Sequence, residues 1–298
     1  MMSLSPAGDA ARNKLRKRQA LLDRSFRTVC AICTWAGILI LFVLIGKILY
    51  EGLPNLSWDF LSNFPSRKAE KAGLKAAIAG TAWVISLTAL VSIPVGISAA
   101  IYLEEYGTKN KLSTFLETNI SNLAGVPSIV YGILGLAILV RMFQLGVSVL
   151  AGALTLSLLI LPIIIVSSRE ALRAVPPGLR QASYALGASK WYTVSRIVLP
   201  SALPGILTGV ILSLSRAIGE TAPLIIVGAA SYIAYTPTGP MDQYTVLPMQ
   251  IFEWAGRPQD DFRDLAASGI IVLLVALFTM NALAIWLRQH YSTRLRGK

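Results

Sequence analysis

The sequence predicts an all-α membrane protein with six transmembrane helices, and three observations support this. Hydrophobic residues make up 54% of the 298 residues and charged residues only 14%, which is too much apolar surface for a water-soluble domain. The apolar residues gather into stretches near the length of about 20 residues that crosses a bilayer as a helix. The 27 Lys and Arg outnumber the 15 Asp and Glu, and they concentrate beside these stretches, where basic residues set membrane orientation.

A basic tail is expected at residues 1–28, followed by a transmembrane domain over residues 29–298. The first apolar stretch, Val29–Ile45, is longer than a typical cleavable signal core, so we expect a retained span whose basic flank stays in the cytoplasm. The other five spans are predicted at Ala77–Leu103, Thr118–Val140, Val147–Ser167, Leu203–Ala230 and Ala266–Leu287. Six spans place both termini in the cytoplasm and the chain in the inner cell membrane.

Four prolines lie within or beside the predicted spans, namely Pro94, Pro127, Pro162 and Pro223. Proline lacks a backbone N–H group and tends to kink a helix, so we expect bends at these positions. Helix breaks occur in transporters, but also in membrane bundles of other kinds, because neighbouring helices satisfy the freed carbonyl groups. The prolines therefore do not indicate a function by themselves.

The last connection on the outer side, Thr236–Leu265, is unusually acidic. Its carboxylates are Asp242, Glu253, Asp260, Asp261 and Asp264. A loop of this length is compatible with a surface that binds a partner and equally with a solvated connection. The sequence leaves both interpretations open.

The two cysteines, Cys30 and Cys33, stand at the start of the first span, and the one histidine, His290, is remote in sequence. A metal site of the common Cys and His type needs further ligands at a suitable spacing. Cysteine in an apolar helix usually behaves as a small hydrophobic residue. We therefore expect neither a metal site nor a redox site.

A cation and an anion, Arg216 and Glu220, interrupt the apolar segment that contains the fifth span. A charge near the bilayer centre costs about 2.5–3.5 kcal/mol on insertion scales, so it needs a partner, an aqueous cavity or a function. On a helical wheel Ser213 falls on the same face as both charges. At 1.5 Å per residue, Arg216 lies roughly 20 Å beyond Pro204 and thus past the middle of the bilayer.

These three residues, Arg216, Glu220 and Ser213, are the candidate substrate pathway. A guanidinium supplies fixed positive charge and directed donors to an oxyanion that loses its hydration in a pore. Glu220 can hold Arg216 when the pore is empty and limit how tightly the anion is retained. A permanent salt bridge that only joins helices is the alternative. Gly205 and Gly209, on the same face, predict close packing of another helix.

The connection after the fourth span, residues 169–200, is long enough to hold structure of its own. A short helix is predicted at Leu179–Ala188, with Gly187 able to end it in a left-handed conformation. Its small and apolar face is formed by Leu179, Ala182, Ser183 and Leu186, whereas Arg180, Gln181 and Tyr184 face the other way. The sequence therefore presents one small, apolar helix face outside the bilayer.

In this connection Gln181-Ala182-Ser183 is followed by Gly187 and then, after nine residues, by Ile197-Val198-Leu199-Pro200. This pattern resembles the EAA loop of ATP-binding-cassette (ABC) importer permeases. The family has Glu-Ala-Ala where this chain has Gln181-Ala182-Ser183, so a charge that could pair with the ATPase is absent. The resemblance implies a type I importer permease fold and a separate ATPase that receives the helix. The implied coupling residues are Leu179, Gln181, Ala182, Ser183, Leu186 and Gly187. An amphipathic helix that touches only lipid is the alternative.

Further stretches resemble the phosphate-specific permeases of this class. These stretches are Gly80-Thr81, Ile101–Tyr106, Ala124–Gly132, Ala217–Pro223, Leu247–Phe252 and Asn281–Arg288. The continuation Thr221-Ala222-Pro223-Leu224 is more similar to the PstA type than to its PstC partner. The resemblance implies a heterodimer with a PstC-type permease, a dimeric cytoplasmic ATPase and an extracytoplasmic phosphate-binding protein.

The chain contains no GxxxxGK[ST] phosphate loop, so ATP and magnesium would be bound by the partner ATPase, with no cofactor in this chain. The resemblance implies a transport subunit and not an enzyme, with ATP hydrolysed by a separate subunit. No HExxH or GxSxG motif occurs, which argues against an intramembrane protease or lipase without excluding one. Two other functions stay open: a permease for another oxyanion such as sulfate or molybdate, and a gradient-driven secondary transporter or channel. The EAA spacing argues against the second, because such a carrier has no ATPase to dock.

Overall fold

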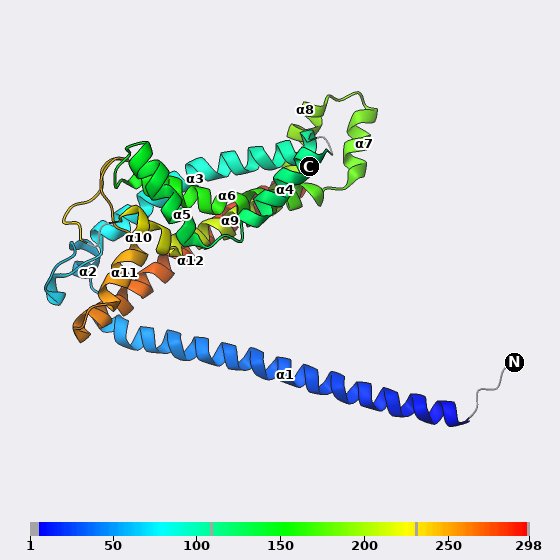
Figure 1. The fold of residues 1–298 in the computed structure, drawn as a ribbon, viewed down its shortest axis with the longest axis horizontal. Helices are drawn as coiled ribbons and strands as arrows, with labels where there is room; N and C mark the ends of the chain where they lie inside the picture. The colour runs from blue at the N-terminus through cyan, green and yellow to red at the C-terminus, as the bar shows by residue number, and fades with distance from the viewer. Residues whose placement is uncertain (1–5, 108–109, 230–231, 297–298) are drawn as a thin grey trace. The chain divides into compact units, whose positions relative to one another are not determined.

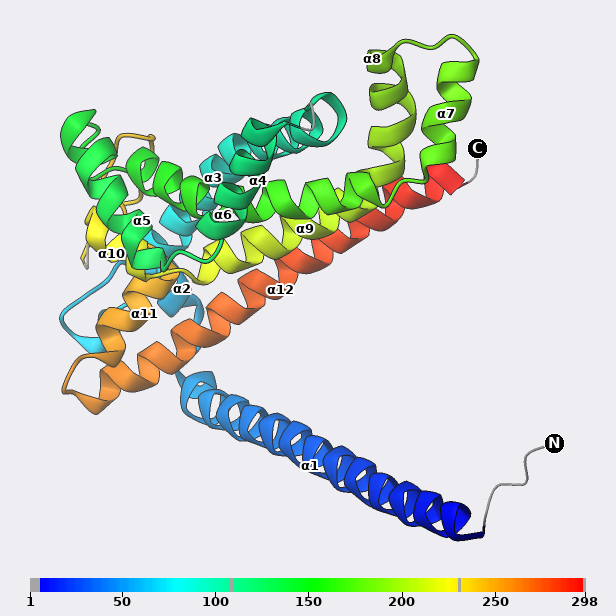
Figure 2. The same ribbon diagram turned by 45° about the vertical axis from the view of Figure 1, so that its right-hand side comes forward.

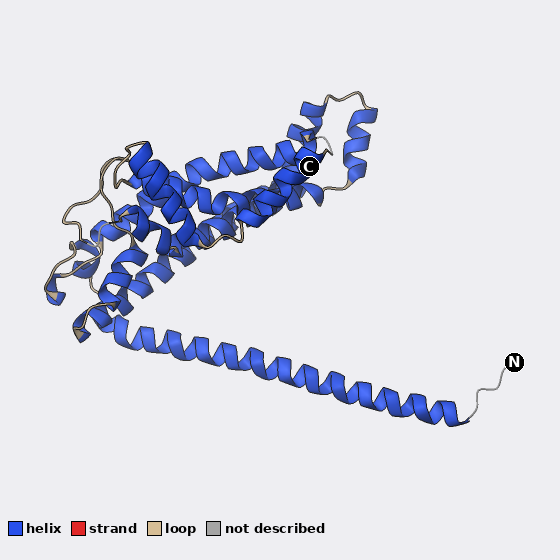
Figure 3. Ribbon diagram, viewed as in Figure 1, coloured by secondary structure: helices blue, strands red, loops and turns tan. Residues whose placement is uncertain are grey.

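A computed structural model describes residues 6–107, 110–229 and 232–296, and these residues are helical except for short connections (Figures 1 and 3). The chain divides into two compact units, Met1–Glu51 and Gly52–Lys298. The first unit is formed by helix α1, Pro6–Gly52. Within it Lys47 and Glu51 form an ion pair at 3.7 Å, one helical turn apart. The helix begins at Pro6, so most of the basic tail expected at residues 1–28 is helical and continuous with the helix of the first span.

The second unit begins with short helices, and its long helices are then joined by shorter helical segments. In chain order they are η1 Leu53–Asn55, α2 Trp58–Ser62, η2 Ala69–Lys71, α3 Lys75–Ile101, η3 Tyr102–Tyr106, α4 Lys111–Leu123, α5 Ser128–Leu134, η4 Gly135–Met142, α6 Val149–Arg173, α7 Pro177–Ala185, α8 Lys190–Thr193, η5 Val194–Val198, α9 Leu199–Gly219, α10 Ala222–Val227, α11 Leu247–Ala255 and α12 Asp260–Arg296. The segments η3, η4 and η5 are π-helical, with an i→i+5 hydrogen-bond pattern.

Among the described residues, five helices are long and apolar enough to cross a membrane, and a bent pair makes a sixth span. The bent pair, Ser113–Leu123 and Ser128–Met142, turns by 106° within the third span expected at Thr118–Val140. The fifth expected span, Leu203–Ala230, lies earlier in the chain than predicted, because the continuous helix runs from Lys190 to Gly219 and α10 is a separate helix that starts at Ala222. The prediction of six spans is therefore confirmed, with one of them formed by a bent pair.

The prolines account for these breaks only in part. Pro127 precedes α5 and Pro223 lies in the first turn of α10, where the missing N–H group costs no helical hydrogen bond. By contrast, Pro94 lies inside α3 and Pro162 inside α6, and both helices continue through them. Helix breaks thus occur beside two of the four prolines, and the bends expected at Pro94 and Pro162 stay a prediction.

Helices α3 and α6 pack closely along a row of small residues. Every fourth residue of α3 is buried, and the row consists of Ala76, Gly80, Val84, Thr88, Ser92, Gly96 and Ala100. A Cβ atom at Gly96 would lie 2.6 Å from the Ile164 side chain of α6. The Thr88 hydroxyl donates to the Ala153 carbonyl of α6 at 3.2 Å. Small residues at this spacing let two helices approach closely inside a membrane, so α3 and α6 form the centre of the bundle.

Helix α9 covers α6, and α12 runs along α9 (Figure 2). Two polar contacts join α9 to α12. The Ser215 hydroxyl donates to the Asn281 amide oxygen at 2.5 Å, and Arg288 donates to the Thr208 hydroxyl at 2.9 Å. Hydrogen bonds between side chains of neighbouring spans add to van der Waals packing where water is absent.

The second unit has two different ends. Helices α7 and α8 lie at one end, whereas α2, α10 and α11 lie at the other (Figures 1 and 2); we refer to them as the α7 end and the α11 end. At the α11 end the Thr81 hydroxyl accepts a hydrogen bond from the Leu247 N–H group at 2.9 Å. The first turn of α11 is thereby fixed to α3. The candidate pathway residues Arg216 and Glu220 lie where α9 ends, on the side of α9 that is far from α7 (Figure 2).

Candidate functional site

Arg216 and Glu220 form an ion pair at the end of α9. The Arg216 Nε donates to Glu220 Oε1 at 3.2 Å. Glu220 is no longer helical, with φ −76° and ψ 124°, and it is the residue that ends α9. The Arg216 side chain is 47% exposed and the Glu220 side chain 17%, so the guanidinium remains accessible on the surface of this chain. The pair is therefore local, and the break between α9 and α10 gives its carboxylate a position outside the helix.

Ser213 does not share this exposure. Its side chain is buried, and its hydroxyl donates to the Gly209 carbonyl of the same helix at 2.8 Å. The helical wheel gives Ser213 a direction close to that of Arg216, one turn earlier on α9, but the Ser213 side chain is buried whereas that of Arg216 is accessible. The hydroxyl of Ser213 is already used as a donor within the helix.

Gly205 and Gly209 face α6. A Cβ atom at Gly205 would lie 2.8 Å from the Cβ of Ala171, and one at Gly209 would overlap the Ser167 hydroxyl. The close partner of these glycines is therefore another helix of the same chain. This contact positions the first half of α9 on α6, and Arg216 lies on the same face about two turns further along the helix, where its side chain is accessible.

The connection between α6 and α9 contains α7, which covers most of the helix expected at Leu179–Ala188. Gly187 has φ +79°, the left-handed conformation that glycine adopts without strain and that ends helices. From Lys190 the helix runs without interruption through η5 and α9 to Gly219, a length of 30 residues. The helix that follows the connection therefore reaches Arg216 but not Glu220.

The exposed face of α7 differs from the expected one. Its exposed side chains include those of Leu179, Gln181 and Ala182, and Leu186, just after the helix, is 89% exposed. Ser183, expected on this face, is instead buried and its hydroxyl lies 2.8 Å from the Thr193 hydroxyl of α8. Gln181, expected on the opposite face, therefore lies on the accessible surface and Ser183 does not.

Arg180, on the inner side of α7, makes contacts that sequence reasoning missed. Its guanidinium forms an ion pair with Glu105 of η3 at 2.7 Å. Neighbouring Glu104 forms a second pair, with Arg173 of α6 at 2.9 Å. Arg169 of α6 contacts Glu117 of α4 at 2.8 Å. The two residues of each pair lie on different helices and are 52 to 75 positions apart in the sequence. No helical periodicity could therefore pair them.

The acidic connection Thr236–Leu265 is mostly structured and its carboxylates have separate partners. Glu253 accepts from Arg257 at 2.6 Å, and Asp260 pairs with Arg263 at 3.1 Å. Asp242 accepts hydrogen bonds from the Thr238 N–H group, the Gly239 N–H group and the Thr238 hydroxyl, which hold the pKa of its carboxyl below the usual value.

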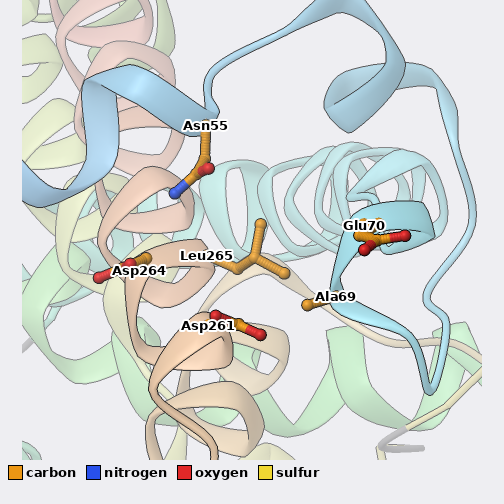
Figure 4. Close-up of a pocket in the computed structure, with 6 residues that line it drawn as sticks. All are labelled: Asn55, Ala69, Glu70, Asp261, Asp264 and Leu265. Atoms are coloured by element: carbon orange, nitrogen blue, oxygen red, sulfur yellow. The ribbon is translucent and has the colours of Figure 1, made fainter.

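Two of these acidic residues line a cavity of about 260 Å³ at the α11 end (Figure 4). Asp261 and Asp264 of α12 face Glu70 of η2 across it, with Leu265 between them. This concavity brings together residues of η2 and of the start of α12, which are about 190 residues apart in the sequence. Whether it binds a partner stays a prediction.

The two cysteines lie on the surface of α1. Cys30 and Cys33 are both free and exposed, and within the described residues no group of three or more His, Cys, Asp or Glu side chains could hold a metal ion. The His290 side chain lies outside the described residues.

The arrangement of broken and continuous helices is that of importer permeases. The chain superposes on the bacterial alginate ABC transporter, solved with its alginate-bound periplasmic protein, with a TM-score of 0.65 at 19% identity, covering 95% of this chain and 97% of the other. Against the inward-facing MetNI methionine ABC transporter the TM-score is 0.57 at 19% identity, covering 74% and 94%. These similarities define the fold as that of a type I ABC importer permease.

Sequence comparisons agree with this class and make it specific. The probable ABC transporter permease protein YqgI of Bacillus subtilis is 30% identical over 90% of this chain and 95% of its own length. The phosphate transport system permease protein PstA is 35% identical in Pasteurella multocida, over 90% and 93%, and 31% identical in Yersinia pestis, over 95% and 97%.

Residues 92–297 match the family model described as binding-protein-dependent transport system inner membrane component. The chain belongs to this family. It is a multi-pass inner-membrane permease subunit and not an enzyme. The matched region includes both the Arg216–Glu220 pair and α7.

Proposed function

We propose that the chain is the PstA-type permease subunit of an ATP-driven importer of inorganic phosphate. The observation that carries the proposal is the half-exposed Arg216 guanidinium, held by Glu220 at the end of an apolar helix. A guanidinium binds an oxyanion through parallel N–H donors and stays charged at every physiological pH. The similarity to PstA permeases over more than nine-tenths of their length supports phosphate as the anion.

The α7 end is the cytoplasmic end in this proposal, which also places both termini in the cytoplasm. Exposed residues of α7, including Gln181, Ala182 and Leu186, would contact a dimeric ATPase that binds ATP and magnesium. The α11 end would face an extracytoplasmic phosphate-binding protein. A second permease subunit of the PstC type would complete the pore, with Arg216 on the accessible side of α9 facing it.

The pair then acts by exchange of partners. In the empty pore Glu220 neutralises Arg216, which lowers the cost of a charge at this depth. An entering phosphate competes for the guanidinium, and Glu220 regains it as the anion leaves, so binding stays reversible. An arginine without a competing carboxylate would retain the anion more tightly and slow its release.

The proposal is tested with the complex of this chain and its partner subunits in sealed vesicles. Uptake of radiolabelled phosphate should require ATP and the phosphate-loaded binding protein, and should exceed uptake of sulfate or molybdate. Equal transport of sulfate or molybdate would contradict the choice of anion. Uptake driven by an ion gradient without ATP would contradict the transport class.

A further inference from the structure

The π-helical segment η3, at the end of α3, contacts both helices of the connection that holds α7. Glu105 Oε1 of η3 accepts hydrogen bonds from Arg180 of α7, at 3.2 Å from Nε and 2.7 Å from Nη2. The next residue, Tyr106, has the Lys190 ammonium of α8 over its ring, 5.0 Å from the centroid. Two neighbouring residues of η3 thus contact α7 and α8, one by an ion pair and one by a cation–π interaction.

The Arg180 guanidinium is fixed by more than its carboxylate. It also donates to the backbone carbonyls of Leu172, at 2.9 Å, and Val175, at 2.8 Å, where α6 ends. The side chains of Arg180 and Glu105 are only 20% and 7% exposed. The guanidinium is planar and its N–H groups have fixed directions, so little side-chain entropy is lost for each hydrogen bond that it makes. Arg180 therefore joins the first turns of α7 to α6 and to η3 as a stiff link.

Glu104 extends this link to the last turn of α6. It accepts hydrogen bonds from Arg173 Nε of α6, at 3.0 Å and 2.9 Å to its two oxygens. Adjacent carboxylates on one segment therefore serve two different helices, Glu104 towards α6 and Glu105 towards α7. The segment closes with the π-type hydrogen bond from the Gly107 N–H group to the Tyr102 carbonyl at 2.7 Å, a local geometry that often occurs at functional sites.

We propose that η3 receives the displacement of α7 when the ATPase closes and passes it to the packed pair α3 and α6. Arg180 and Glu105 are positioning residues in this step, and they lie on the inner side of α7, away from Gln181, Ala182 and Leu186. This inference rests on the proposed function. It adds a second route to the one along α8, η5 and α9 towards Arg216, because α3 packs closely against α6 at Thr88 and Gly96 and the two helices would move together.

The test uses the whole complex, reconstituted in vesicles with the phosphate-loaded binding protein. Glu105→Gln and Arg180→Gln each remove one charge of the link, and Arg196→Gln removes a charge from the exposed surface of η5 as a matched control. Three quantities are measured: the amount of ATPase that co-purifies, the basal ATP hydrolysis, and its stimulation by the loaded binding protein. A defect in docking would change the first quantity, whereas a defect in transmission changes only the third.

We expect both link variants to retain the ATPase and their basal hydrolysis within about twofold, while stimulation falls at least fivefold. Arg196→Gln should behave as the wild type. The double exchange Glu105→Arg with Arg180→Glu should recover part of the stimulation, since the attraction is restored but the hydrogen bonds to Leu172 and Val175 are not. If the neutral variants fail to assemble, Arg180→Lys, which keeps the charge without the planar fork, should lower stimulation by two- to threefold.

Several results would overturn the inference. Normal stimulation in both link variants, or in Arg180→Lys where those do not assemble, would show that the link transmits nothing. Loss of the ATPase from an assembled permease, or no recovery in the double exchange, would assign the pair to docking or to folding instead. The wild-type complex separates this from the proposed function: absence of stimulation in the wild type contradicts both, whereas stimulation that persists in the variants contradicts only the route through η3.

Discussion

Two arginine–glutamate pairs lie at different positions in the bundle and differ in every property except their chemistry. Arg216 and Glu220 are four residues apart, with a single hydrogen bond of 3.2 Å and an arginine that is nearly half exposed. Arg180 and Glu105 are 75 residues apart, with two hydrogen bonds between them and both side chains largely buried. The first pair can be opened by a competing anion. The second pair joins separate helices, and opening it would break several hydrogen bonds of the Arg180 guanidinium.

The difference shows how surroundings decide what an ion pair can do. Removing one member of a buried pair leaves an uncompensated charge, at a cost of about 3–5 kcal/mol, whereas an exposed pair contributes about 0–1 kcal/mol. A weak, accessible pair suits exchange with a substrate, and a buried pair with further backbone partners suits the transmission of force. The following predictions test this distinction, from the largest expected effect to the smallest.

The largest effect is expected from Arg216→Gln. A hydrogen bond to a charged group contributes about 1.5–3 kcal/mol, so losing the guanidinium should lower phosphate uptake at least about tenfold. The subunits should still assemble, because Arg216 has no bonded partner in another helix among the described contacts. Arg216→Lys, which keeps the charge but loses the planar fork, should give an intermediate rate. Normal uptake in Arg216→Gln would remove this pair from the pathway.

The next effect concerns the exposed face of α7. Ala182→Asp places a charge on the surface that is proposed to contact the ATPase, where desolvating it is costly. We expect the ATPase recovered with the permease to fall several-fold, with ATP hydrolysis falling in proportion. Ala182→Ser keeps the side chain small and should retain the ATPase. Full recovery and full stimulation in Ala182→Asp would argue that α7 contacts something else, such as the lipid surface.

A smaller effect, on stability alone, is expected from the contact between α9 and α6. Gly209→Val forces side-chain atoms into the space of Ser167, and such overpacking costs about 1–3 kcal/mol. The midpoint of thermal unfolding in detergent should fall. Gly219→Ala is the matched control, since no atom lies within 4 Å of a Cβ at that position. An unchanged midpoint in Gly209→Val would mean that α9 can separate from α6 without loss.

The smallest effect is expected from Glu220→Gln, and it distinguishes a gating role from a bracing role. If Glu220 competes with the anion, its loss should lower the apparent KM for phosphate and lower the maximal rate by a few-fold, because the anion is released more slowly. If it only braces α9, the KM should stay constant and the unfolding midpoint should fall. A lowered midpoint with unchanged kinetics would therefore contradict the exchange of partners.

The sequence predicted much of the fold and one of the two pairs. Apolar length located the spans, and the spacing of Arg216 and Glu220 placed them one turn apart, because such contacts are local. The left-handed Gly187 and the close approach at Gly205 and Gly209 also follow from local chemistry. The burial of Ser213 could not be predicted, because a helical wheel gives a direction on the helix but not what the neighbouring helices bury.

Other features could not be derived from local patterns. A proline at position 127 predicts a bend but not its angle of 106°. The Arg180–Glu105 pair joins residues 75 positions apart, so only the fold brings them together. The row of small residues in α3 is one signal that was available, since a residue is buried at every fourth position from Ala76 to Ala100.

The most direct test of the distinction between the two pairs is ATP hydrolysis by the reconstituted complex, measured with and without the phosphate-loaded binding protein in Arg216→Gln and Glu105→Gln. The account predicts that Arg216→Gln keeps the stimulation although it no longer moves phosphate, and that Glu105→Gln loses the stimulation although the ATPase stays bound. The opposite pattern, with stimulation lost in Arg216→Gln and retained in Glu105→Gln, would contradict it.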